Sequence, residues 1–250
     1  MNPISIVGAG PGALDLMTIR AQERIKTADV LVWTDSLIPI QITKLVKNEC
    51  EKIKTSSLTL EEILNILINK HKEGKKIVRL HDGDPCFYGA ISEQICRLND
   101  VGIEVEIVPG VSAYQATAAT LGFELTIPGL TQTIILSRAD GRTGKPEKES
   151  LQRLASIQSS LCLYLSARHV EEVQSILINY YPEDTPVAIA YRVTWPDEWV
   201  KVIPLSELAK TSKEKNLIRT TLYIISPSLK IGKNRSKLYD SKHSHLFRPS

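Results

Sequence analysis

Three short loops rich in glycine and proline carry the residues best suited to bind a small molecule. They span residues 8–12, 83–89 and 109–113, and each follows an apolar run that is typical of a β-strand. Ligands of open parallel sheets bind outside the carboxyl ends of the strands, where such loops gather. Gly83 permits a close backbone approach, and Pro85 restricts the backbone of the residue before it. We therefore predict that the three loops form one small-molecule pocket at a sheet edge.

The first loop also matches a dinucleotide-binding pattern. Gly8-Ala9-Gly10-Pro11-Gly12-Ala13 has the Gly-x-Gly-x-x-Gly/Ala spacing, after a strand and before a helical pattern. Asp35 ends the next apolar run, where such proteins place a ribose-binding acid. This interpretation predicts a nicotinamide-dependent oxidoreductase. Pro11 argues against it, because proline removes a backbone donor from the loop that should meet the pyrophosphate. A tight turn that only packs a helix on a sheet is the other alternative.

Composition and charge exclude several classes of protein. The chain has 250 residues, of which 42% are hydrophobic and 24% charged, as in a globular protein of two domains. It has no apolar run of transmembrane length, and its first residues do not show the pattern of a signal peptide, so we expect a cytoplasmic protein without a membrane partner. Six of its basic residues lie in the tail 230–250, which leaves the rest slightly acidic and argues against a nucleic-acid partner. We expect no metal site at the scattered cysteines or at the pair His243 and His245.

Strand and helix patterns alternate, which predicts an α/β fold. We expect strands at 4–8, 30–34, 76–80, 103–108, 132–137, 160–165, 186–191, 199–203 and 221–226. Helices are expected near 13–27, 59–72, 87–99, 112–121, 147–157, 168–179 and 204–210, the second of which opens with the capping box Thr59-Leu60-Glu61-Glu62. The expected strands at 186–191 and 199–203 are joined by only a short polar connection. We therefore expect them to form an antiparallel pair, which makes the sheet of the second half a mixed one. The predicted domains are 1–120 and 121–228, followed by a basic tail, 229–250.

The sequence motifs together resemble a known family, the tetrapyrrole methyltransferases of cobalamin and sirohaem synthesis. The general family motifs are Gly-Ala-Gly-Pro-Gly from residue 8, Gly-Asp-Pro-x-x-Tyr-Gly-Ala from residue 83 and Val-Pro-Gly-Val-Ser from residue 108. Segments 136–143, 163–166 and 186–198, and the tail segments 236–240 and 243–249, resemble the branch that methylates precorrin-4 at carbon 11. The resemblance covers nearly the whole chain.

The resemblance implies two α/β domains, the first with a mostly parallel sheet and the second with a mixed sheet. It also implies a homodimer that binds S-adenosylmethionine in a cleft between the domains. The family's cofactor contacts fall here on Pro11, Asp82, Gly83, Asp84, Phe87, Ser112, Ala113, Leu165, Val193 and Thr221. S-adenosylmethionine has no phosphate, so it needs no helix N-terminus and tolerates a proline in the first loop.

The substrate implied by the resemblance is precorrin-4 or cobalt-precorrin-4, a flat tetrapyrrole with several carboxylates. Arginine binds carboxylates with two hydrogen bonds, and Arg138, Arg142 and Arg192 are the expected substrate contacts. Asp35 aligns with an acidic position proposed as a base in related uroporphyrinogen enzymes, although the carbon-11 branch more often has glycine there. The alternatives are another methyltransferase of this family, the nicotinamide enzyme, or a carrier that kept the fold without catalysis.

Overall fold

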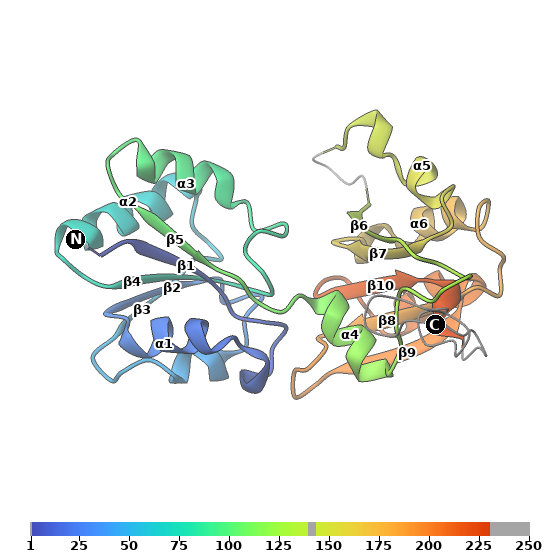
Figure 1. Cartoon of the computed structure of the whole chain (residues 1–250), viewed down its shortest axis with the longest axis horizontal. Coiled ribbons are helices and arrows are strands. Elements are labelled where there is room, and N and C mark those ends of the chain that lie inside the picture. The colour runs from blue at the N-terminus through green and yellow to red at the C-terminus, as the bar shows by residue number, and fades with distance from the viewer. Residues whose placement is uncertain (1, 140–143, 231–250) are drawn as a thin grey trace, which may run out of the picture. The chain divides into compact units, whose positions relative to one another are not determined.

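The computed structural model describes residues 2–139 and 144–230, which form two compact units (Figure 1). The first unit runs to Ala116 and also includes Val193–Asp197; the second comprises Thr117–Arg192 and the residues from Glu198 onward. Each unit contains one five-stranded sheet. The sequence predicted a border at residue 120 and gave no sign that 193–197 belongs with the first unit.

The sheet of the first unit is entirely parallel, in the order β3-β2-β4-β1-β5. Its strands are β1 (Ile4–Gly8), β2 (Val30–Trp33), β3 (Glu51–Lys54), β4 (Ile77–His81) and β5 (Val105–Val108). Its helices are α1 (Ile19–Thr27), α2 (Leu60–Lys72) and α3 (Ile91–Asn99), and α4 (Ala113–Leu121) begins in this unit. Parallel pairing places the carboxyl ends of all five strands at one edge of the sheet.

Helices cover both faces of this sheet, with α1 on one face and α2 and α3 on the other (Figure 1). Successive strand residues point to opposite faces. In β2, Leu31 packs in the core cluster that contains Ile25 of α1, whereas Val32 packs in the cluster that contains Leu67 of α2 and Leu98 of α3. Burial on both faces explains why the central strands are mostly apolar.

The second unit has a mixed sheet in the order β6-β7-β10-β8-β9, in which only β6 and β7 pair in parallel. Its strands are β6 (Ile134–Arg138), β7 (Ser160–Tyr164), β8 (Pro186–Tyr191), β9 (Trp199–Pro204) and β10 (Thr221–Ile225). Its helices are α5 (Leu151–Ala155), α6 (Val170–Leu177) and α7 (Leu208–Glu214). The predicted fold class is confirmed, including the antiparallel pair β8–β9.

Three elements of the first unit differ from the prediction. The helix expected near 13–27 is a single short turn, Leu14–Leu16, followed by α1, which begins at Ile19 after its cap Thr18. Strand β3 was missed because Glu51–Lys54 has only one apolar residue; it is a polar edge strand with little burial. Helix α3 begins at Ile91 and not near residue 87, because Tyr88 and Ala90 have φ angles of 57° and 50°. Left-handed residues cannot continue a helix, so the second loop is longer than the sequence pattern indicated.

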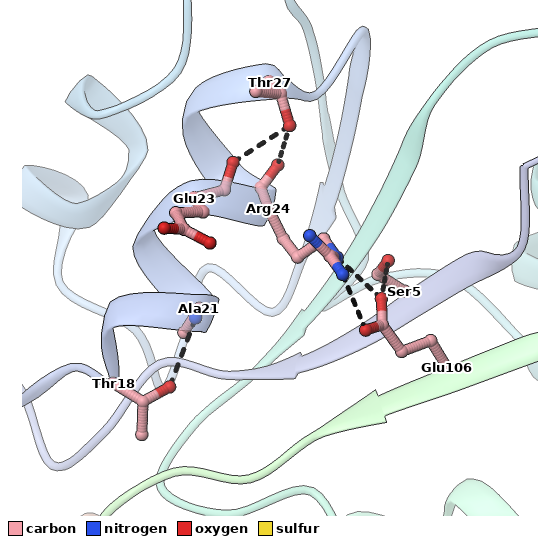
Figure 2. Close-up of polar contacts among 7 residues, drawn as sticks. All are labelled: Ser5, Thr18, Ala21, Glu23, Arg24, Thr27 and Glu106. Atoms are coloured by element: carbon pink, nitrogen blue, oxygen red, sulfur yellow. Dashed lines mark hydrogen bonds and ion pairs between the residues drawn. The ribbon is translucent and has the colours of Figure 1, made fainter.

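A polar cluster joins α1 to the sheet at the edge opposite the three loops (Figure 2). Arg24 donates from Nε and Nη2 to the two carboxylate oxygens of Glu106, at 2.7 and 2.8 Å. Ser5 on β1 donates to the same carboxylate at 3.0 Å. Thr18 caps α1 by accepting from the backbone N–H of Ala21. The cluster therefore ties one helix to two strands.

We expect Glu106→Gln to lower the free energy of unfolding at pH 7 by about 1 kcal/mol, a modest value because Arg24 is partly exposed. The hydrogen bond from Arg24 lowers the pKa of Glu106 from its usual 4.5, and Ser5 adds to the effect. The unfolded chain therefore takes up the proton first as the pH falls. The stabilisation is fully present above about pH 4.5 and is lost as the pH falls through the folded pKa. Urea unfolding should show a difference between the two proteins that shrinks in acid; a constant difference would contradict the assignment.

Candidate active site

The three glycine- and proline-rich loops lie together at the carboxyl edge of the first sheet. The first and second loops form a short bridge, in which the Gly10 N–H donates to the Gly83 carbonyl at 3.2 Å and the Gly83 N–H donates to the Gly10 carbonyl at 2.9 Å. The Ala9 N–H donates to the carbonyl of His81 at 2.7 Å. The second and third loops are linked through Asp84, whose Oδ2 accepts from the Gly110 N–H at 3.0 Å. The sequence prediction that these loops meet agrees with this geometry.

The junction of the loops has no room for side chains at two of its glycines. A Cβ on Gly8 would lie 2.6 Å from the Gly83 carbonyl oxygen and 2.7 Å from the Gly110 nitrogen. A Cβ on Gly110 would collide with the same oxygen and lie 3.1 Å from the Cα of Gly8. Gly83 itself has a φ of 56°, which favours glycine. The three loops therefore approach one another backbone to backbone, which requires glycine at residues 8 and 110.

Asp84 holds two loops in place with its carboxylate. Oδ1 accepts from the Cys86 N–H at 2.8 Å, and Oδ2 accepts from the Gly110 N–H of the third loop. Both oxygens are thus engaged with the protein backbone. Sequence comparison with the family marked Asp84 as a cofactor contact; the geometry gives its side chain the additional role of positioning the other loops.

Helix α4 starts at the end of the third loop. Ser112 precedes its first residue, Ala113, and the Ser112 N–H donates to Oε1 of Gln115 at 2.9 Å. This is the reciprocal half of a capping box, in which a side chain three residues into the helix closes the N-terminus. The ring of Phe87, in the second loop, lies with its centre 4.8 Å from that of Tyr88, and the two rings are tilted by 60°. The predicted contacts from Asp82 to Ala113 therefore occupy one continuous edge of the first unit.

The loop between β8 and β9 belongs to the first unit and contacts the first glycine-rich loop. The Ala13 N–H donates to Oγ1 of Thr194 at 2.9 Å, and Trp195 donates from Nε1 to the Pro11 carbonyl at 3.0 Å. Val193, a predicted cofactor contact, is 4% exposed. The sequence predicted only a short polar connection between two strands here. Contacts between residues about 180 positions apart leave no local pattern in the sequence, so this contact was not predicted.

Trp195 also lines a pocket of about 430 Å³ beside the ends of β2 and β3. Its charged lining residues are Asp35, Lys54 and Asp197, and Trp33 and Ile38 contribute apolar walls. The Ser56 N–H donates to Asp35 at 3.2 Å, and hydrogen bonding to Ser56 lowers the pKa of Asp35 below its usual value. A carboxylate with a lowered pKa is a weaker base at neutral pH. The base role of Asp35 stays a prediction that this environment disfavours.

Two buried polar residues on β4 were not singled out from the sequence. Arg79 is 4% exposed and donates to Thr34, Thr55 and the Val32 carbonyl at 3.3 to 3.4 Å. Burial lowers its pKa to about 10, so it remains charged. Burial and the nearby Arg79 lower the pKa of His81 to about 3, which keeps this imidazole neutral. The sequence does contain a signal for this pair. Both residues interrupt the apolar run of a central strand, at alternate positions that point to the same face of the sheet.

The remaining predicted residues lie in the second unit. Leu165 follows β7 with a φ of 52° and is 67% exposed, and Thr221 begins β10. Arg138 ends β6 and donates to the carbonyls of Ala139 and Gly144. The guanidinium of Arg192 lies 5.2 Å from the centre of the Tyr191 ring. Arg142, His243 and His245 lie outside the described residues.

Within residues 2–139 and 144–230, no cluster of histidine, cysteine and acidic residues could hold a metal ion. The four cysteines, Cys50, Cys86, Cys96 and Cys162, are not joined in disulfides. In the same part of the chain, every helix is too short or too polar to span a membrane.

Comparison with known proteins gives matches along most of the chain. A family model, Tetrapyrrole (Corrin/Porphyrin) Methylases, matches residues 3–209. A cobalt-precorrin-4 C(11)-methyltransferase of Methanocaldococcus jannaschii is 41% identical over 99% of this chain and 96% of its own length. A precorrin-4 C(11)-methyltransferase of Pseudomonas aeruginosa is 38% identical over 98% of each chain.

Solved structures agree with these sequence matches. The structure of a cobalt precorrin-4 methyltransferase, a cobalamin biosynthetic enzyme, superposes with a TM-score of 0.88 at 39% identity, over 91% of this chain and 96% of that one. A uroporphyrin-III C-methyl transferase of Thermus thermophilus complexed with S-adenosylhomocysteine has a TM-score of 0.75 at 25% identity, over 91% and 99% of the two chains.

Proposed function

This chain belongs to the tetrapyrrole (corrin/porphyrin) methylases, and from that premise we propose that it methylates precorrin-4, or cobalt-precorrin-4, at carbon 11 in cobalamin biosynthesis. The methyl donor is S-adenosylmethionine, and S-adenosylhomocysteine is the second product. The observation that carries the proposal is the identity of 38 to 41% over nearly the full length to relatives of that name. The loop junction on the first unit provides a matching site.

The residues of the first unit fit this cofactor. The bridge between Gly10 and Gly83 joins the backbones of the first two loops, and the third loop lies against them with no side chain in between. The bridging N–H and carbonyl groups are paired with each other, so an adenosine and an amino acid group would use the other backbone groups of the three loops. We assign the binding of the cofactor to Pro11, Asp82, Gly83, Phe87, Ser112, Ala113 and Val193, with Asp84 as both contact and loop holder. Leu165 and Thr221 complete the set on the second unit.

The bound cofactor supplies an activated methyl group on its sulfonium. The chain's own residues then have to align that group with the ring carbon, since an in-line displacement depends chiefly on proximity and orientation. The loop junction, joined by the Gly10–Gly83 bridge and by Asp84, would hold the donor in one place. The neutral His81 and the lowered pKa of Asp35 make neither side chain a strong proton donor or acceptor at neutral pH. Positioning is therefore the main contribution of the protein.

The substrate carries several carboxylates on a flat ring, which calls for cations around the acceptor. We assign this role to Arg138 and Arg192, and to Arg142, which lies outside the described residues. Arg138 is already anchored on two backbone carbonyls, and an anchored guanidinium loses less entropy when it binds a carboxylate. A homodimer and a cytoplasmic location are also part of the proposal; the unbonded cysteines suit a reducing compartment.

The proposal is tested by incubating the protein with S-adenosylmethionine and the tetrapyrrole and measuring the product by mass spectrometry. One added methyl group is expected, together with one equivalent of S-adenosylhomocysteine. Binding of both compounds without any mass gain would support the carrier alternative. Methylation of a different tetrapyrrole only would support another member of the same family.

A further inference from the structure

In the contact between the β8–β9 loop and the first glycine-rich loop, side chains of the β8–β9 loop bind backbone groups of the glycine-rich loop. Thr194 and Trp195 each form a hydrogen bond to the backbone of the glycine-rich loop, one to the N–H of Ala13 and one to the carbonyl of Pro11. Gly12 lies between these two points. The loop is therefore held on both sides of Gly12 by a segment that is remote in sequence.

The indole of Trp195 occupies the space that a side chain at residue 12 would need. A Cβ on Gly12 would overlap Cδ1 of Trp195, and would lie 2.7 Å from its Nε1 and 3.1 Å from Oγ1 of Thr194. The ring thus packs directly on the backbone of the glycine-rich loop. A glycine is required there because of this packing and because of the φ of 154° at the same residue.

The segment that brings Trp195 to this place has a strained backbone. Arg192 and Thr194 have φ angles of 46° and 67°, although neither is glycine. Left-handed backbone is most unusual for a β-branched residue such as threonine. Strain of this kind persists only where surrounding contacts enforce it, and it is concentrated at functional sites. A simple hairpin connection between two strands would not require it.

We propose that Trp195 is a positioning residue for methyl transfer, which fixes the glycine-rich loop at the cofactor site. Its Nε1 sets the position of the Pro11 carbonyl, and its ring sets the position of Gly12. Its side chain also lines the pocket beside Asp35 and Lys54. One residue therefore connects the cofactor loop with the pocket next to it. The inference rests on the proposed function, because it assigns Trp195 to the alignment of the donor.

Two variants separate the hydrogen bond from the ring. Trp195→Phe keeps an aromatic ring and removes the donor to Pro11; we expect the dissociation constant of S-adenosylhomocysteine to rise up to about tenfold. Trp195→Ala removes both contacts, and we expect kcat at saturating S-adenosylmethionine to fall on the order of a hundredfold, because misalignment persists after binding. Trp199→Phe, on β9 of the same hairpin, is the matched control and should leave both quantities unchanged.

Tryptophan fluorescence tests directly whether Trp195 lies at the cofactor site. S-adenosylhomocysteine should change the fluorescence of the wild type and of Trp199→Phe, but this change should be largely lost in Trp195→Phe. A double-mutant cycle tests the packing: the loss of cofactor affinity caused by Gly12→Ala should be smaller in the Trp195→Ala background, since the overlap with the ring is gone. If the effects of the two substitutions on cofactor affinity are purely additive, the proposed packing of the Trp195 ring on Gly12 is wrong.

The outcomes also separate this inference from the proposed function. If the wild type transfers the methyl group and all Trp195 variants have normal kcat and affinity, Trp195 is not a positioning residue. If the variants lose only thermal stability and keep normal kinetics, the contact is merely structural, and the inference is wrong. If the wild type neither binds S-adenosylhomocysteine nor transfers methyl, the proposed function itself fails.

Discussion

Gly110→Ala is expected to abolish measurable binding of S-adenosylhomocysteine and to lower the free energy of unfolding by about 3 kcal/mol or more, the upper range for overpacking. The new methyl group would collide with the Gly83 carbonyl oxygen and lie 3.1 Å from the Cα of Gly8. These two atoms and the third neighbour, the Gly83 carbonyl carbon at 3.1 Å, all belong to the backbone and cannot rotate away as a side chain would. The three loops would have to separate, and the cofactor site with them.

Gly102→Ala is the matched control for this substitution. Gly102 has a φ of 74°, and a Cβ there would meet nothing within 4 Å. Its cost is therefore limited to backbone strain of about 1 kcal/mol, with unchanged cofactor affinity. Chemical unfolding and calorimetric titration of the two variants check the expectation. Normal binding by folded Gly110→Ala would show that the loop junction is not the cofactor site.

The second large effect concerns the choice of cofactor. We expect saturable binding of S-adenosylmethionine and S-adenosylhomocysteine, and no measurable binding of NADH or NADPH. A dinucleotide needs free N–H groups at the start of a helix that directly follows the glycine-rich turn. Here Pro11 has no N–H, the Ala13 N–H already donates to Thr194, and only a single short turn, Leu14–Leu16, follows. Helix α1 begins later, at Ile19, after its cap Thr18.

Isothermal calorimetry with the four compounds decides between the two classes of protein. Tight NADH binding without any response to S-adenosylhomocysteine would falsify the assignment of the loops. The position of Asp35 also argues against the oxidoreductase interpretation, which assigned this residue to bind a ribose. It lies instead beside Ser56, on the wall of the pocket that contains Trp195.

The sequence predicted the parts of this fold that local pattern controls. Apolar runs located the central strands, and glycine with proline located the loops that meet at the sheet edge. The capping box at Thr59 and Glu62 is present as predicted. Each of these features depends on residues close together in the chain, whose spacing reflects one face of an element or one turn.

Features that depend on distant partners were missed. The edge strand β3 has a polar sequence, because only one side of it pairs, with β2. The docking of Trp195 on Pro11 and Gly12 joins residues about 180 positions apart, and no local pattern encodes it. Arg79 interrupts an apolar run, but its hydrogen-bond partners, the hydroxyls of Thr34 and Thr55, lie 45 and 24 positions away and leave no local pattern. The candidate site was thus predicted through its loops, and its supporting contacts came from the structure.

The central claim is regiochemical and is tested most directly by locating the transferred methyl group. The tetrapyrrole is incubated with the protein and S-adenosylmethionine that carries carbon-13 in its methyl group, and the product is examined by NMR. We predict a single labelled methyl on carbon 11 of precorrin-4 or of its cobalt form. Label on another ring carbon, or no label with either substrate, would contradict the proposed function.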